Sequence, residues 1–535
     1  MKNVTLSLTR LPLLFQLLCL LNSCAYSQAG QNEFSDLMNQ VVTVVQSSHL
    51  RPRVIDDSFS EDLFVDFLER VDPTQQWLTV AEIDQLHPHQ LTIDDDINSG
   101  NFRFFEAVFD LLPQDFSREE LFNKFLDSYL SVNDYQSDFM SPAERAAWNA
   151  SFNRSLVGTG VRFEIKGDYP EITEVYVDGP AWKTERIRTG DRLLGIQTDD
   201  DGDVDFAGRS GDGVSRMLAG PEGSIVRLQL QHADGQIEVV KVTREQFALS
   251  RTTAAVFGGK SGEKIGYIRL PRFYSGNYSS ATDVLADLSY LKAEAVSGII
   301  LDLRNNKGGS VAEAVHIIGY FLRGGTVMQA VYRDGRHRML PDDDPLAQYE
   351  GKLMVLVNEG SASASELTAA TLQQYSRAVI VGRQTFGKGT IQRFFEIIDE
   401  RTGRKMGDVK LTIGGFYAGE GYATQYRGVM PDIVLSLESP AGITGERKVK
   451  NALRIDHLPS YPGQHSPSFV AVLRQKRQDR NLLSADRREV LTLDMKPETS
   501  DREKAHWELV LLKDVDLYES FLIINDYLEV APEIK

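Results

Sequence analysis

Cysteine is nearly absent from this 535-residue chain: only Cys19 and Cys24 occur, both within the first 24 residues. The rest of the chain therefore has no disulfide, no thiolate metal site and no cysteine nucleophile. It also has no HExxH pair, no G-x-S-x-G elbow and no Walker loop, the motifs of zinc, α/β-hydrolase and nucleotide chemistry. We expect neither a metal nor a cofactor.

Positive charge is also scarce. The 58 lysines and arginines stand against 76 acidic residues, and the formal net charge of −18 argues against nucleic acid as a partner. Apolar content of 42% and charged content of 25% are ordinary for a globular protein. A chain of this length is expected to divide into about three or four domains.

Beyond its start the chain has no apolar run that approaches the ~18 residues needed to span a bilayer. The start itself is typical of an export signal, because Lys2 and Arg10 are basic and residues 11–21 are apolar. Leu21-Asn22-Ser23-Cys24 resembles a lipobox, in which Cys24 becomes lipidated; ordinary cleavage within residues 25–29 is the alternative. Residues 1–24 therefore predict export, and we expect the protein in the periplasm of a Gram-negative bacterium. If Cys24 is lipidated, Ala25 favours anchoring at the outer membrane.

Four segments follow the signal. Residues 32–150 are predicted to be helical because apolar residues recur at three- and four-residue spacing, and Ser58 to Ser60 provide a cap signal for one helix. Short alternating runs between Gly, Pro and Asp turns predict a small β-rich module at 151–250. Strands alternate with helices over 251–438, which favours a sheet covered by helices. The polar stretch 439–535 is predicted to be a helical extension. The fold class is thus a multidomain α+β protein.

The β-rich module resembles a PDZ domain. Its landmarks in chain order are Gly158-Thr159-Gly160-Val161, Gly179-Pro180-Ala181, the stretch 190–196 (GDRLLGI) and the stretch 218–223 (LAGPEG). PDZ domains receive a peptide C-terminus by adding it as a strand, with backbone N–H groups of the first loop on the carboxylate. The resemblance assigns that role to residues 158–161.

A serine and a lysine could form a nucleophile and base within residues 360–392 (GSASASELTAATLQQYSRAVIVGRQTFGKGTIQ). Small residues before a predicted helix allow a sharp turn that presents a serine at the helix N-terminus, where free N–H groups stabilise an oxyanion. Lys388, between two glycines, could lose its proton if apolar surroundings lower its pKa, and could then activate serine. Taken alone, both stretches are equally typical of an ordinary helix start and an ordinary turn.

This region resembles the C-terminal processing peptidases, also called tail-specific proteases, which have S-A-S-A-S-E and T-F-G-K-G segments about twenty-five residues apart. That spacing selects Ser363 as nucleophile for Lys388, and leaves Ser361 and Ser365 as capping and packing residues. The resemblance implies a ClpP- or crotonase-like α/β core. It also places the Ala364 N–H in the oxyanion hole and gives Gln392 the role of orienting the lysine.

Further stretches extend the resemblance. Residues 301–309 (LDLRNNKGG) match a glycine turn that completes the oxyanion hole through either Gly308 or Gly309, although Lys307 departs from the usual small residue. The order of helical region, PDZ domain, protease core and helical extension is that of the long tail-specific branch. Some members of that branch carry an acidic residue where this chain has Gln374, so a triad with that acid is not expected.

The resemblance implies a serine endopeptidase that recognises apolar C-terminal tails of exported proteins or peptides. Two alternatives remain open from the sequence. One is a silent PDZ scaffold that binds peptides without cleaving them. The other is a protease that acts only with an adaptor lipoprotein.

Overall fold

The computed structural model describes residues 34–113, 116–152, 155–176, 179–198, 202–209, 211–248, 251–259, 262–276, 278–342, 344, 346–435, 445–463, 467–480, 493–495, 504, 511 and 514–530. The expected signal, with Cys24, lies outside these residues. The described part contains no helix long and apolar enough to cross a membrane. Within it, no three His, Cys, Asp or Glu side chains gather as a metal site would require.

The N-terminal region is helical, as expected. Its helices are residues 34–48, α2 (Asp57–Val71), α3 (Val80–Leu86), α4 (Ile93–Ser99), α5 (Arg103–Leu111), α6 (Arg118–Asn133) and α7 (Pro142–Phe152). The expected cap at Ser58 to Ser60 is wrong: Asp56 caps α2, and its carboxylate accepts the Phe59 N–H at 3.0 Å. Asp56 has extended backbone while Ser58 already lies within the helix.

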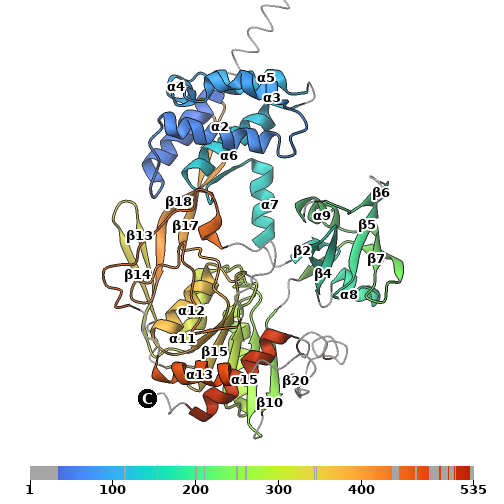
Figure 1. The fold of residues 1–535 in the computed structure, drawn as a ribbon, viewed down its shortest axis with the longest axis vertical. Coiled ribbons are helices and arrows are strands. Elements are labelled where there is room, and N and C mark those ends of the chain that lie inside the picture. The colour runs from blue at the N-terminus through green and yellow to red at the C-terminus, as the bar shows by residue number, and fades with distance from the viewer. Residues whose placement is uncertain are drawn as a thin grey trace, which may run out of the picture.

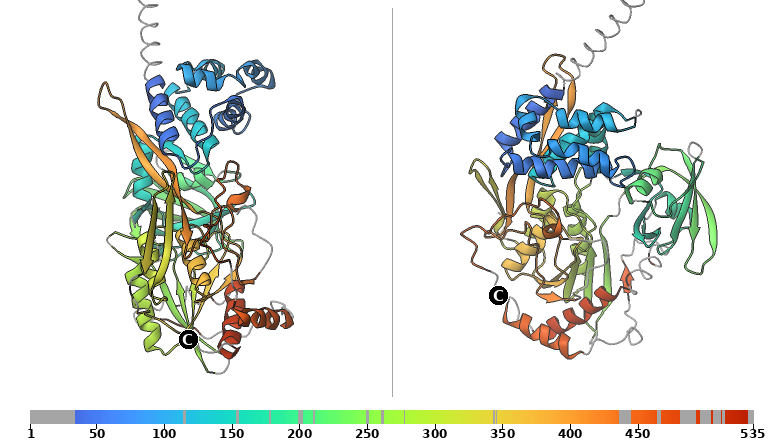
Figure 2. Two further views of the ribbon diagram at one scale, coloured as in Figure 1. Left: turned by 90° about the vertical axis from the view of Figure 1, so that its left-hand side faces the viewer. Right: turned by 45° about the horizontal axis from the view of Figure 1, so that its top comes forward.

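This helical region is joined to the rest of the fold through a strand that the sequence did not reveal. β1 (Asp138–Met140) pairs antiparallel with β18 (Lys405–Ala418), which also pairs with β17 (Thr390–Ile398) and β13 (Gly325–Tyr332). The long β17–β18 hairpin rises beside the helices (Figure 2). Its Ile397, Val409 and Leu411 belong to the same buried cluster as the phenylalanines of α2, α5 and α6.

The β-rich module stands to one side of the core (Figure 1). Its strands are β3 (Val161–Lys166), β4 (Tyr169–Val175), β5 (Arg192–Thr198), β6 (Gly202–Asp205), β7 (Ile225–Gln231) and β8 (Ile237–Thr243), with helices α8 (Pro180–Thr184) and α9 (Gly211–Leu218). The sheet order is β3-β4-β5-β7-β8, so β3 is an edge strand. A ladder of β2 (Ser155–Gly158) with β9 (Glu245–Ala248) ties the two ends of the module together.

The core is built on a seven-stranded sheet of order β19-β16-β15-β12-β11-β10-β20. Strands β11 (Lys264–Arg269), β12 (Gly298–Asp302), β15 (Lys352–Val357), β16 (Val379–Gly382) and β19 (Ile433–Val434) run parallel, and β10 (Thr253–Gly258) and β20 (Leu493–Met495) pair antiparallel at the other edge. Parallel strands present their carboxyl ends at one edge, where sites of α/β proteins form. The loops after β12, β15 and β16 therefore lie together.

Helices cover both faces of this sheet, as the alternation predicted. Along β12, Ile299 and Leu301 face α10 (Ser280–Ala293), α11 (Val311–Gly319) and α12 (Ala364–Gln374), while Ile300 faces the other side. That side is covered by α13 (Ser468–Asp479) and α15 (Val515–Val530) of the C-terminal extension. The extension is not wholly helical, since β20 joins the sheet. The mixed α+β class is confirmed, and the boundaries proposed for the segments stay predictions.

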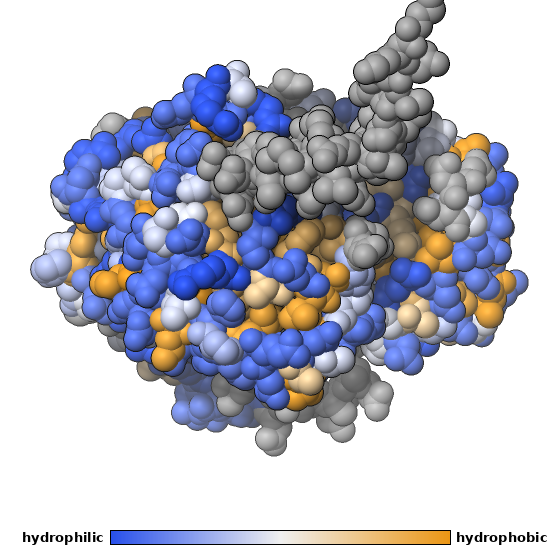
Figure 3. Space-filling view, turned by 90° about the horizontal axis from the view of Figure 1, so that it is seen from above, coloured by the Kyte–Doolittle hydropathy of each residue, from blue (hydrophilic) through white to orange (hydrophobic). Residues whose placement is uncertain are grey.

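Seen from above, the surface is largely hydrophilic, with apolar residues gathered near its centre (Figure 3).

Candidate active site

Ser363 lies where the loop after β15 enters α12. Its φ of 57° and ψ of −113° are unusual for a residue with a side chain. Such strained conformations persist only where the surroundings enforce them, and they cluster at active sites. The backbone is held here by the N–H of Ala362, which donates to Asn306 O at 3.0 Å, and by the Ser363 N–H, which donates to Glu366 at 2.8 Å. Ser363 itself is only half-buried.

The neighbouring serines have structural partners, in line with the roles expected for them. Both are fully buried. The Ser361 hydroxyl donates to Leu303 O and the Ser365 hydroxyl to Asn306 O, each at 2.8 Å. These bonds tie the nucleophile segment to the turn after β12.

The two glycines of that turn differ in their surroundings. A Cβ on Gly308 would lie 2.9 Å from Ser363 Cβ and 3.0 Å from Ala364 N, whereas one on Gly309 would lie 2.2 Å from Phe273 O. Both have positive φ, at 96° and 143°, so only glycine fits either position. The Gly308 N–H donates to Asn306 Oδ1 at 2.9 Å, while the Gly308 carbonyl accepts the N–H of Phe273. Gly308 therefore packs directly against the nucleophile segment, but its own N–H is already engaged.

Lys388 lies in the loop between β16 and β17, called the base loop after the role expected for Lys388, and backbone hydrogen bonds hold much of this loop. The N–H groups of Gly387 and Lys388 donate to Glu366 at 2.7 and 2.8 Å. The N–H of Gly389 donates to Gln425 Oε1 at 2.7 Å. Further contacts include Phe386 N–H to Ser361 O, Glu446 N–H to Phe386 O, and Tyr426 N–H to Gly387 O. The base loop is thus held in one conformation.

Burial is the main cause that lowers the pKa of Lys388, and the ammonium of Lys410 lowers it further. Three carboxyl groups act in the opposite direction: Glu446, Asp134 and Glu366. Within the part of the chain that the structure describes, the side chains of Ser363 and Lys388 form no hydrogen bond with each other. Catalytic contacts of this kind are often loose without substrate and tighten when it binds.

Glu366 connects the two halves of the site, and the sequence reasoning missed it. This fully buried carboxylate accepts the N–H groups of Ser363, Gly387 and Lys388 and the Thr385 hydroxyl, the last at 2.6 Å. Burial raises the pKa of Glu366 to about 8 despite these donors. Its place three residues after the N-cap, the pattern of a capping box, was the signal that could have identified it.

Among the described residues, no hydrogen bond joins Gln392 to Lys388. Its side-chain amide donates to Thr390 Oγ1 at 2.7 Å and to Thr412 Oγ1 at 3.3 Å. The register of β17 against β18 shifts between Ile391 and Gln392. The orienting role that the resemblance implies for Gln392 stays a prediction.

A groove of about 360 Å³ runs along the edge strand of the β-rich module, between β3 and α9. Its lining residues are Val161, Arg162, Phe163, Ile165, Tyr176, Gly211, Ser215 and Phe247. Of the four residues predicted to hold a peptide, only Val161 lines it. Gly158 bridges Ala219, while the carbonyls of Thr159 and Gly160 accept the N–H groups of Ala181 and Tyr176.

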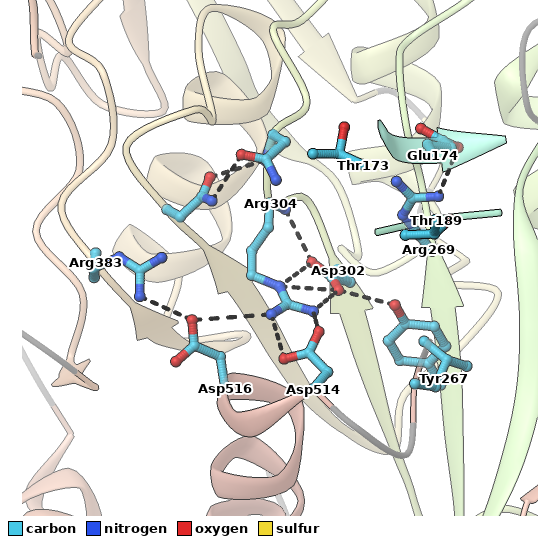
Figure 4. Close-up of a pocket in the computed structure, with 13 residues that line it drawn as sticks. Thr173, Glu174, Thr189, Tyr267, Arg269, Asp302, Arg304, Arg383, Asp514 and Asp516 are labelled. Carbon is cyan, nitrogen blue, oxygen red and sulfur yellow. Dashed lines mark hydrogen bonds and ion pairs between the residues drawn. The ribbon is translucent and has the colours of Figure 1, made fainter. Parts of the chain in front are cut away.

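A second cavity, of about 230 Å³, lies between β4 of the module, the carboxyl ends of β11 and β12, and the start of α15 (Figure 4). Its charged groups pair with one another. Arg304 binds Asp302 and Asp514, each at 2.6 Å. Burial acts to raise the pKa of Asp514. The charge and hydrogen bonds of Arg304 act more strongly in the other direction, and they hold that pKa below its usual value. This network fastens the C-terminal helix to the loop that leads to Gly308.

Arg304→Ala is expected to cost about 3–5 kcal/mol of unfolding free energy, because it leaves the buried carboxylate of Asp302 and the half-buried one of Asp514 without their cation. Arg323→Ala is the matched control: it removes a pair with Glu350 whose side chains are 66% and 56% exposed, and it should cost less than ~1 kcal/mol. Urea denaturation compares the two, and similar midpoints would contradict the importance of the buried network.

Two protein families match separate parts of the chain. Residues 264–435 match peptidase family S41, and residues 41–154 match the tail-specific protease N-terminal domain. The chain is 33% identical over 346 residues to the tail-specific protease of Haemophilus influenzae, covering 64% of this chain and 49% of that protein. It therefore spans about half the length of that relative. It is 28% identical over 377 residues to the carboxyl-terminal-processing protease of Synechocystis sp., covering 69% of this chain and 84% of that protein.

Solved structures give two further similarities. The photosystem II D1 C-terminal processing protease is 24% identical, with a TM-score of 0.43, covering 70% of this chain and 93% of that one. The PDZ domain of a carboxy-terminal protease from Vibrio cholerae, solved with a peptide, is 31% identical, with a TM-score of 0.17, covering 18% of this chain and 99% of that one. Through residues 264–435 the chain contains a domain of peptidase family S41, and the relatives that it resembles are named tail-specific and carboxyl-terminal-processing proteases.

Proposed function

We propose that this protein is a serine endopeptidase in which Ser363 is the nucleophile and Lys388 the general base. The observation that carries the proposal is the bridging carboxylate of Glu366, which bonds the backbone of both residues. The strained backbone of Ser363 and the lowered pKa of Lys388 support it independently. Neutral Lys388 would take the proton of Ser363 Oγ as that oxygen attacks the peptide carbonyl, and would return it to the leaving amine.

The oxyanion would be held by the N–H groups of Ala364 and Gly309. Gly309 is favoured over Gly308 because a trans peptide directs its N–H opposite to the Gly308 carbonyl, which bonds Phe273. The Gly308 N–H, by contrast, is used by Asn306. Two backbone donors at a helix start are the usual means of stabilising a tetrahedral intermediate.

We further propose that the β3–α9 groove receives the C-terminal tail of an exported protein as an added strand. The free edge of β3 and the apolar lining from Val161, Phe163 and Ile165 support this mode. Export, lipidation of Cys24 and dependence on an adaptor lipoprotein stay proposals from the sequence. A silent peptide-binding scaffold is disfavoured because Ser363, Lys388 and Gln392 are all present.

An unfolded reporter with an apolar C-terminal tail tests the function. Wild type is expected to degrade it, Ser363→Ala to leave it intact, and a reporter ending in two aspartates to raise KM about tenfold or more, because a charged tail would be buried in an apolar groove. Cleavage by Ser363→Ala at the wild-type rate would overturn the assignment. If wild type binds the apolar tail without cleaving the reporter, the result would favour a silent scaffold or a protease that needs an adaptor lipoprotein.

A further inference from the structure

Glu446 lies beneath the base loop, although it is fifty-eight residues beyond Lys388 in the chain. It opens a short 3-10 helix (Glu446–Lys448), and its N–H donates to Phe386 O at 2.7 Å. A Cβ on Gly387 would lie 3.4 Å from Glu446 Cβ. The side chain of Glu446 is fully buried. A carboxyl group is therefore enclosed against the residue that precedes the proposed base.

Only one oxygen of this carboxyl group has a hydrogen-bond partner among the described residues. Oε1 accepts from Gln425 Nε2 at 2.6 Å, and the same glutamine receives the Gly389 N–H on its Oε1. Oε2 is buried without a hydrogen bond within the described part of the chain, and so is the hydroxyl of Tyr135. Tyr135 comes from the loop after α6 of the helical region, and it lowers the pKa of Glu446. A buried oxygen without a partner is costly, and such an atom calls for an explanation.

The charges around this carboxyl group connect it to Lys388. Burial raises the pKa of Glu446 to about 7, while the Gln425 amide, the nearby Tyr135 hydroxyl and the charge of Lys388 all lower it. Asp134 opposes its ionisation. The groups that act on Lys388 in turn are Lys410, Glu446, Asp134 and Glu366, and Glu446 is foremost among the three carboxyl groups.

We propose that Glu446 is a positioning residue for Lys388. The Oε2 atom of Glu446 accepts a hydrogen bond from the Lys388 ammonium once the proton of Ser363 has reached Nζ. The proton moves from Ser363 Oγ to Lys388 Nζ and then from Nζ to the leaving amine nitrogen as the C–N bond breaks. Glu446 exchanges no proton with the substrate. Its negative charge compensates the ammonium while that charge exists, and Tyr135 keeps the carboxylate oriented. The helical region would thereby contribute directly to the active site. This inference rests on the proposed function.

Glu446→Gln removes the anion that raises the pKa of Lys388, so that pKa should fall further. The acid limb of kcat/KM is then expected to move to lower pH by about half a unit or more. Loss of the charge compensation is expected to lower kcat about tenfold with little change in KM. Tyr135→Phe removes a group that favours the ionised carboxylate, and should give the same changes in smaller degree.

Glu313→Gln is the matched control. Glu313 is also a buried carboxylate of the core, and it accepts bonds from Ser279, Ser280 and Ala281. Its variant should keep the wild-type pH profile, whatever it costs in stability. A folded Glu446→Gln with unchanged kcat and an unmoved acid limb would overturn the proposal. Should that variant fail to fold, an unmoved limb in Tyr135→Phe would overturn it instead.

Titration of Lys388 itself separates this inference from the peptidase assignment. Competitive labelling with acetic anhydride at a series of pH values, read by mass spectrometry of the Lys388 peptide, reports the ionisation of the lysine without any substrate. The midpoint is expected to be lower in Glu446→Gln than in wild type. An equal or higher midpoint would contradict the role of Glu446. Cleavage by Ser363→Ala would instead contradict the proposed function while leaving this titration valid.

Discussion

Replacing Lys388 with alanine is expected to lower kcat/KM by about 10⁴-fold or more, the size of effect seen when one member of a nucleophile–base unit is removed. Lys388→Arg should be equally inactive, because a guanidinium keeps its proton and cannot act as base. In wild type the neutral lysine is the active form. Since burial lowers the pKa of Lys388, kcat/KM should rise with pH and level off above that pKa.

Lys352→Ala is the control for this prediction. Burial lowers the pKa of Lys352 as well, but its ammonium donates to the carbonyls of Tyr527 and Leu528 near the end of α15. Reporter cleavage should therefore proceed at nearly the wild-type rate in this variant. Circular dichroism establishes that each variant is folded. Comparable losses in Lys352→Ala and Lys388→Ala would show that the effect is not specific to the proposed base.

Glu366→Ala should lower kcat by about 10²- to 10³-fold, because it deletes the acceptor that fixes both the nucleophile and the base loop, and small misplacements of reacting groups are that costly. Each unpaired buried donor should also cost about 1–3 kcal/mol of stability. Glu313→Ala removes a comparable buried acceptor that bonds Ser279, Ser280 and Ala281 and neither Ser363 nor the base loop. It should be destabilised to a similar degree but keep its kcat, and a similar fall in kcat would contradict a specific role for Glu366.

The stability of Glu366→Gln relative to wild type should also depend on pH. The unfolded chain loses the Glu366 proton near 4.5, whereas burial raises the folded pKa to about 8. Between these two pKa values the folded protein therefore binds one more proton than the unfolded chain. The stability that Glu366 contributes is complete below the unfolded pKa and is lost as pH rises through the folded pKa. The advantage of wild type over Glu366→Gln in thermal midpoint should shrink over that range.

The elements that local sequence patterns determine were predicted well. The helix that begins after Ser363 and the buried strands on either side of it lie where they were expected, because both strands are short apolar runs. The PDZ-like module was identified by its ordered turns. Ser363 and Lys388 were selected by motif spacing, and the structure brings their loops together because β15 and β16 are parallel neighbours.

The parts that depend on distant segments were not predictable. Tyr135, Gln425 and Glu446 have no motif around them, and they meet the base loop only because β1 docks the helical region on β18 and the chain returns after β19. The five-stranded sheet that contains β1, β13, β17 and β18 was missed for the same reason, since its strands come from three separate segments of the chain. Glu366 is the exception, because its capping-box position was visible in the sequence.

The nucleophile is tested most directly by covalent labelling. Incubation with a fluorophosphonate, followed by peptide mapping, is predicted to modify Ser363 alone, at a rate that rises with pH as Lys388 loses its proton. The Lys388→Ala variant is predicted to remain unmodified. Modification of another serine in active enzyme, or equal labelling of Ser363 in Lys388→Ala, would contradict the Ser363–Lys388 pair.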